Sequence, residues 1–99
     1  MLDHQNDQLA ATADQLSEQW VEAWGKSRIL QESRKPFLAI LAKEASEADG
    51  GKMSAAAAER EALASPRYRE FFKGMVEAER EEKRLGLLYE NHKLKYMKS

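Results

Sequence analysis

The fold of this chain is decided by the stretch Ala48-Asp49-Gly50-Gly51-Lys52, the strongest loop signal in its 99 residues. Glycine and proline are otherwise sparse, and good helix formers dominate on both sides of the stretch. A glycine at position 50 or 51 can adopt the left-handed conformation that ends a helix. We therefore expect one long helix before this turn and a second long helix that folds back against it.

A second break follows at Ala64-Ser65-Pro66. Ser65 is a typical N-cap, and proline is favoured as the first residue of a helix. Ser54 is the N-cap expected for the short segment between the two breaks. Period-two alternation, which strands require, is absent. The sequence predicts an all-α fold in a single domain of residues 1–99. We expect an antiparallel helical hairpin with helices at about 4–48, 54–64 and 66–97 and a turn at 49–53.

Pro36 lies inside the first predicted helix. A proline there removes one backbone hydrogen bond and clashes with the preceding turn, at a cost of about 3 kcal/mol. The apolar residues keep helical spacing on both sides of it, so we expect a kinked helix. A true break near Lys35 stays open as the alternative.

Both long helices carry an apolar seam at the three- and four-residue spacing by which helices pack. The two rows of the first seam are Leu2, Leu9, Leu16, Ala23, Leu30 and Phe37, and Ala13, Trp20, Ser27, Arg34 and Leu41. The last helix has Phe71, Met75, Ala78, Glu82, Leu85, Tyr89, His92 and Tyr96. The first seam weakens at Ser27 and Arg34. Charge favours antiparallel packing, because residues 1–25 contain five acidic side chains and residues 83–99 contain five basic ones and one acidic.

Self-association is expected because a lone hairpin would have a thin core. Charged residues make up 33% of the chain, and its mean hydropathy is -0.73. A dimer or higher oligomer, built as a helical or coiled-coil bundle, would bury the remaining apolar groups. The residues expected at this protein interface are Leu9, Leu16, Trp20, Trp24, Leu30, Phe37, Leu41, Phe71, Met75, Leu85 and Tyr89. Gly25 and Gly74 are candidates for close backbone approach between helices.

Catalysis finds little support in the residue types. There is no cysteine, which removes thiol chemistry, disulfides and thiolate metal sites. A serine nucleophile needs a base held beside it, and His4 and His92 lie near the chain ends. In a hairpin the two histidines would meet near Asp3, Asp7 and Glu90, but zinc normally needs four converging ligands. We predict no enzyme, no catalytic residue, no metal site and no cofactor.

A nucleic-acid-associated factor is the alternative function. Its candidate residues are Arg28, Arg34, Lys35, Arg67, Arg69 and Lys73, which aromatic residues accompany along the chain. Single-stranded nucleic acid is bound by cations at the phosphates and rings at the bases. The formal net charge of -1 argues against binding driven by electrostatics, so protein binding is the favoured function.

Two stretches resemble a known group of proteins. They are Glu32-Ser33-Arg34-Lys35, which an apolar helical run follows, and AEREALASPRYRE at residues 58–70. They resemble small helical accessory proteins that temperate phages and prophages of proteobacteria encode near genes of early recombination. The resemblance covers about residues 26–90. It implies a helical hairpin with an accessory role, in which the alternative function would assist recombination or replication.

The expected location is the cytoplasm, that of the bacterial host if a phage encodes the chain. No apolar run approaches the ~18–20 residues of a membrane span, and the acidic N-terminal segment is unlike a signal peptide. The expected partners are further copies of the chain and an unknown protein, with nucleic acid as the alternative and no membrane.

Overall fold

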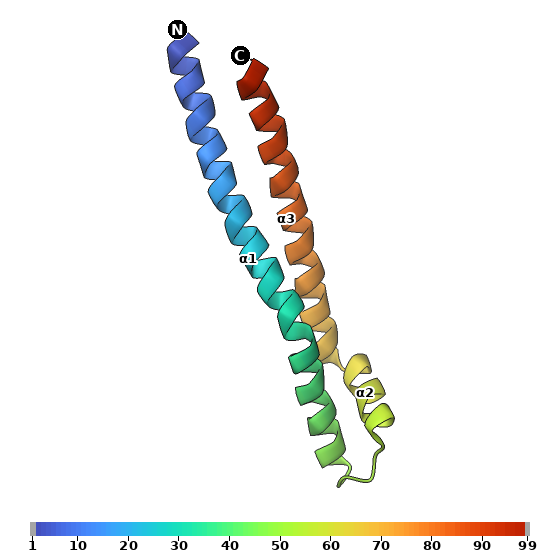
Figure 1. The fold of residues 1–99 in the computed structure, drawn as a ribbon. Helices are drawn as coiled ribbons and strands as arrows, with labels where there is room; N and C mark the ends of the chain where they lie inside the picture. The colour runs from blue at the N-terminus through green and yellow to red at the C-terminus, as the bar shows by residue number, and fades with distance from the viewer. Residues whose placement is uncertain (1, 99) are drawn as a thin grey trace. The chain divides into compact units, whose positions relative to one another are not determined.

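Three helices make up the computed structural model, which describes residues 2–98 and the side chains of residues 12–95 and 97. They are α1 (Leu2–Ala48), α2 (Ala55–Ala64) and α3 (Pro66–Lys98) (Figure 1). No strand occurs between residues 2 and 98, so the prediction of an all-α fold is confirmed. The observed bounds differ from the predicted ones by at most two residues at any helix end.

The turn after α1 forms as the glycines require. Gly50 and Gly51 have φ angles of 67° and 76°, the left-handed region that a side chain would strain. The Gly51 N–H donates to the Ser46 carbonyl at 2.9 Å, and the Gly50 N–H donates to the Glu47 carbonyl at 3.1 Å. These two bonds make the Schellman motif, which ends α1 and satisfies its last carbonyls.

The two predicted N-caps are both confirmed. The Ser54 hydroxyl accepts a hydrogen bond from the Ala57 N–H at 3.1 Å at the start of α2. The Ser65 hydroxyl accepts from the Tyr68 N–H at 3.2 Å and donates to the Ala62 carbonyl at 2.8 Å. Ser65 therefore ends α2 and begins α3 at once, while Pro66 takes the first helical position.

Pro36 removes one backbone hydrogen bond but does not end α1. The helix continues from Leu2 to Ala48 through it, so the alternative of a break near Lys35 is wrong. The side chain of Pro36 lies on an exposed side of α1. Water can therefore reach the Glu32 carbonyl, which has no N–H donor at position 36. One turn earlier, the Ser33 hydroxyl donates to the Ile29 carbonyl at 2.7 Å.

The described chain divides into two compact units. Unit 1 consists of Met1–Ser27 and Glu77–Ser99, and unit 2 consists of Arg28–Val76. Within each unit a part of α1 runs antiparallel to a part of α3, which confirms the hairpin (Figure 1).

Unit 1 is held by the predicted seam. The Trp20 and Tyr89 rings lie 5.6 Å apart between centroids, tilted by 32°. Ala78 and Leu85 of α3 are buried, as their seam positions predicted. Ser27, which was expected to weaken the seam, is 1% exposed. A serine is small enough to be buried where helices pack closely, and no buried side-chain polar atom among the described residues lacks a hydrogen-bond partner.

Unit 2 has its own small core. Leu41 of α1, Ala62 of α2 and Tyr68 of α3 form its buried cluster, and Phe37 packs against that cluster. The Phe37 ring stacks on Phe71 with 4.9 Å between centroids. The contact of Leu41 with an alanine of α2 lets the short helix pack closely, which fits the alanine-rich sequence of this segment.

Gly86 packs closely against the neighbouring helix of unit 1. The expectation of close backbone approach at Gly25 and Gly74 is wrong. A methyl group on Gly25 or Gly74 would meet no described atom within 4 Å outside the local helix backbone. A methyl group on Gly86 would lie 3.2 Å from both Cε2 and Nε1 of Trp20. The indole ring of Trp20 therefore covers Gly86, which follows the buried seam residue Leu85.

None of the helices in the described part of the chain combines the length and apolar character that crossing a bilayer requires.

Candidate protein interface

Side chains that could bind a metal or take part in catalysis do not cluster among the described residues. No group of three or more metal-ligating side chains forms there, and His4, Asp3 and Asp7 lie outside the residues whose side chains are described. The Arg84 guanidinium donates two hydrogen bonds to the exposed Glu81 carboxylate, at 2.9 and 2.6 Å, and holds the pKa of Glu81 below its ordinary value. This contact is a surface ion pair between residues about one helical turn apart.

Most residues predicted for the protein interface pack inside the chain's own units. Leu41, Met75 and Leu85 are buried. The half-buried members are Leu16, Trp20, Leu30, Phe37, Phe71 and Tyr89. Trp24 is 52% exposed, and Leu9 lies outside the residues whose side chains are described. The hairpin thus uses most of the seam itself, so the surface left for a partner must be sought elsewhere.

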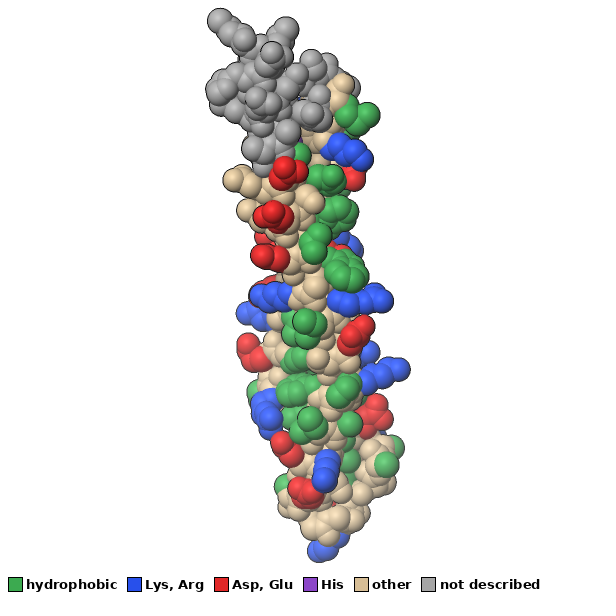
Figure 2. Space-filling view, turned by 60° about the vertical axis from the view of Figure 1, so that its left-hand side comes forward, with side chains coloured by type: hydrophobic (Ala, Val, Ile, Leu, Met, Phe, Trp, Pro, Cys, Tyr) green, Lys and Arg blue, Asp and Glu red, His purple; other side chains and the backbone are tan. Residues whose placement is uncertain are grey.

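A second set of apolar side chains stays at the surface. Figure 2 shows apolar side chains that reach the surface between charged ones. The exposed large apolar residues are Val21, Trp24, Ile29, Ile40, Leu63, Phe72, Leu87, Leu88, Leu94 and Met97. Apart from Trp24, none was among the predicted interface residues. Three of them are β-branched residues in α1 that lie outside the seam spacing. An apolar residue outside the seam is the feature of the sequence that could have predicted this exposed surface.

One part of this surface lies on α1 within unit 2, and we call it the Ile29–Ile40 face. Its residues are Ile29, Ser33, Pro36 and Ile40, at spacings of four, three and four, which bring them to one side of a helix. They line a shallow hollow of about 380 Å³ together with Glu32 and Phe37. Ile29 is 65% exposed and Ile40 is 53% exposed.

Two ion pairs flank the Ile29–Ile40 face along α1. Arg28 lies 3.5 Å from Glu32, and Lys43 lies 4.0 Å from Glu47, each measured from nitrogen to oxygen. All four side chains are largely exposed. The face therefore has an apolar middle and a charged pair toward each end.

The six basic residues of the alternative function separate into different environments. Arg28 pairs with Glu32, as described above. Arg34 donates through Nε to the Tyr68 hydroxyl at 3.0 Å. Arg67 lies 2.5 Å from Glu44 and 5.9 Å from the centre of the Phe37 ring. These contacts tie three of the six cations to groups of the same unit.

The remaining three basic residues line two separate hollows of unit 2. Lys35 lines one of about 430 Å³, with Leu38 among its walls. Arg69 and Lys73 line another of about 290 Å³, beside Phe72. Phe72 is 45% exposed, so this second hollow brings an accessible ring and two cations together.

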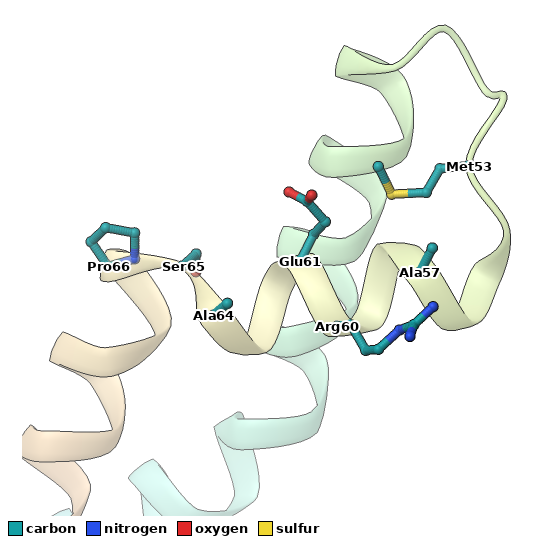
Figure 3. A pocket seen from close by; sticks show the side chains of 7 residues that line it. All are labelled: Met53, Ala57, Arg60, Glu61, Ala64, Ser65 and Pro66. Carbon is teal, nitrogen blue, oxygen red and sulfur yellow. The ribbon is translucent and has the colours of Figure 1, made fainter.

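A further hollow lies where α2 meets α3, and it has a volume of about 650 Å³ (Figure 3). Its lining residues are Met53, Ala57, Arg60, Glu61, Ala64, Ser65 and Pro66. The Ser65 hydroxyl bonds to the Ala62 carbonyl and the Tyr68 N–H, so it serves as a helix cap. A nucleophile needs a neighbouring base, and the lining of this hollow contains no histidine.

Comparison of the chain with protein-family models, with curated proteins and with solved structures yields no match.

Proposed function

We propose that the protein acts by binding other protein chains, copies of itself included, and that it is not an enzyme. The observation that carries this proposal is the exposure of large apolar side chains on the side of α1 away from the seam, with Ile29 at 65% and Ile40 at 53%. Apolar groups clustered at a surface are typical of sites where another protein binds.

The chain's own fold gains little from these two isoleucines. Isoleucine is a weaker helix former than arginine, lysine, glutamate or alanine, which fill most exposed positions among the described residues. Removing apolar surface from water contributes about 25 cal/mol per Å², and side chains this exposed contribute only a small part of that to folding. A partner that covers them would recover the rest.

The resemblance to phage accessory proteins supports the setting that we propose for this binding. In that setting the protein is a small accessory factor of a phage or prophage that acts by self-association and by binding a second protein. Affinity capture with the protein as bait would identify that second protein.

A second candidate function is nucleic-acid binding, and the hollow beside Phe72 favours it. Arg69 and Lys73 would contact phosphates there while the Phe72 ring stacks on a base. Against it, three of the six predicted cations already contact groups of their own unit, and the formal net charge is -1.

The two functions are separated by one titration of labelled single-stranded and double-stranded oligonucleotides at low and moderate salt. The mass of the protein is recorded on the same samples by light scattering. We expect a mass above that of the single chain and no oligonucleotide binding. A monomer that binds oligonucleotides, loses affinity steeply with salt and fails to bind as Arg69→Glu plus Lys73→Glu would overturn the proposal.

A further inference from the structure

We propose that the Ile29–Ile40 face of α1 pairs antiparallel with the same face of a second copy of this chain. The inference deepens the proposed function and rests on its claim of self-association, because it names the surface and the orientation of the pair.

The face can be covered without burying an unpaired side-chain hydroxyl. The Ser33 hydroxyl donates to the Ile29 carbonyl of its own helix at 2.7 Å, so the polar group in the middle of the face already has a partner. Pro36 has no N–H to leave unsatisfied. The surface between Ile29 and Ile40 is therefore mostly apolar and shallowly concave, with a hollow of about 380 Å³ that Glu32 also lines.

The core of unit 2 lies on another side of the same helix. Leu41 is buried against α2 and α3, and Phe37 packs on that cluster from the edge of the hollow. Ile40 precedes Leu41 by one residue, which turns its side chain by about 100° around the helix. The chain consequently folds with Leu41 inside and leaves Ile40 at the surface, 53% exposed.

The charge order along the face identifies the occupant. From the N-terminal to the C-terminal end, the two flanking ion pairs give the order Arg28, Glu32, Lys43 and Glu47, which alternates positive and negative, while Glu44 pairs with Arg67 of its own chain. In an antiparallel pair related by a two-fold axis, Arg28 lies opposite Glu47 of the second copy, and Glu32 lies opposite Lys43 of the second copy. Both pairings have the same midpoint, between residues 37 and 38, so one alignment forms all of them.

The same alignment brings apolar groups together. Ile40 of one copy lies beside Pro36 of the other, near the two-fold axis. Ile29 is level with residue 46 of the other copy and lies between the aliphatic stems of its Lys43 and Glu47, and long charged side chains commonly cover apolar surface in this way. A parallel pair would instead place the flank that carries these four charges on opposite sides of the contact in the two copies, so these attractions between copies would not form.

The test is a charge-reversal series measured by sedimentation equilibrium. Glu32→Lys and Lys43→Glu should each weaken the dimer by about tenfold in Kd, because each turns two attractions between copies into repulsions. The double variant, Glu32→Lys plus Lys43→Glu, should return the Kd to near the wild-type value, because opposite charges again face each other in the antiparallel pair.

The double variant separates contacts between copies from contacts within the helix. Each single reversal breaks one pair inside α1, either Arg28 with Glu32 or Lys43 with Glu47, and the double reversal breaks both. If only the intrahelical pairs mattered, the double variant would be the worst of the three. Circular dichroism on each variant records helix content, so a folding defect is detected separately.

An apolar variant and a matched control complete the experiment. Ile40→Lys should weaken the dimer by at least about a hundredfold, because it places a charge at the apolar centre. Leu63→Lys changes an apolar residue of α2 that is 41% exposed, and it should leave the Kd unchanged.

The outcomes distinguish the two claims. A wild-type chain that stays monomeric overturns the proposed self-association and this pairing with it. A wild-type dimer that Ile40→Lys does not weaken, or a double reversal weaker than both single reversals, overturns the pairing and leaves self-association standing. Loss of the dimer with Ile40→Lys and rescue by the double reversal support both.

Discussion

Gly86 offers the sharpest test of how α1 and α3 pack in unit 1. A methyl group there would lie 3.2 Å from two atoms of the Trp20 indole and 3.5 Å from a third. Replacing glycine by alanine inside a helix stabilises by about 1 kcal/mol when nothing opposes it. At position 86 the indole must retreat by a few tenths of an ångström and loosen its contact with Tyr89, and such a contact is worth about 0.5–1.5 kcal/mol. We therefore expect Gly86→Ala to change the free energy of unfolding by less than about 0.5 kcal/mol.

A larger side chain should make the sign unambiguous. Compared with alanine, valine adds two methyl groups to a Cβ that already contacts the Trp20 indole. Overpacking of this kind costs about 1–3 kcal/mol. Gly86→Val should therefore lower the free energy of unfolding by about 1–2 kcal/mol, since the gain in helix propensity offsets a few tenths. The assay is urea unfolding followed by circular dichroism, with all proteins at one concentration because association adds to apparent stability.

Gly25 supplies the matched control in the same unit. It is also a helical glycine, and a methyl group on it would meet no described atom within 4 Å outside the local helix backbone. Gly25→Ala should stabilise by about 1 kcal/mol, and Gly25→Val should be neutral or slightly stabilising. Equal effects of valine at positions 25 and 86 would refute the packing of Trp20 on Gly86. In a Trp20→Ala background, Gly86→Ala should recover the full stabilisation.

Three other side-chain changes test the contacts within the chain. Tyr68→Phe removes the hydroxyl that accepts from Arg34 and should lower the free energy of unfolding by about 1 kcal/mol in the same urea assay. Leu41→Ala should cost about 2–5 kcal/mol, because Leu41 is 5% exposed at the centre of the unit 2 core. The pKa of Glu81, read from its carboxyl carbon by NMR, should lie below the ordinary glutamate value and return toward it in Arg84→Gln. Because the folded-state pKa is lowered, the stabilisation by this pair is complete above the ordinary pKa and is lost as pH falls through the lowered one.

Each of these predictions has a result that contradicts it. Unchanged stability in Tyr68→Phe would mean that the Arg34 contact does not hold in solution. Leu63→Ala, at a residue 41% exposed, is the control for Leu41→Ala, and an equal loss in both would contradict the assigned core. A Glu81 carboxyl that titrates identically with and without Arg84 would contradict the ion pair.

The helix ends were predictable because their chemistry is local. A left-handed turn needs glycine, so Gly50 and Gly51 identified the end of α1 before any packing was known. Ser65 followed by Pro66 identified the start of α3 for the same reason, since a cap bonds to residues three positions away. The seam was also predictable, because periodic burial follows from helix geometry alone.

The packing details were not predictable, because they depend on the register of one helix against another. Gly25, Gly74 and Gly86 look alike in sequence, and only the register that places Trp20 over Gly86 tells them apart. The polarity of Ser27 predicts a weak point in the seam, yet the closeness of the helices buries the residue. The seam spacing does not predict the exposed Ile29–Ile40 face, because the apolar residues of this face fall outside that spacing.

The central claim is that two copies pair through this face in the antiparallel orientation, and site-directed crosslinking tests it most directly. The wild-type chain has no cysteine, so Glu32→Cys and Lys43→Cys each introduce a single thiol. The two variants are mixed and treated with a short bis-maleimide reagent, and each is also treated alone. We expect the mixture to form crosslinked dimers much faster than either variant alone, because the thiol at position 32 faces the thiol at position 43 of the other copy. Crosslinking of each variant with itself as fast as in the mixture, or no dimer in any sample, would contradict it.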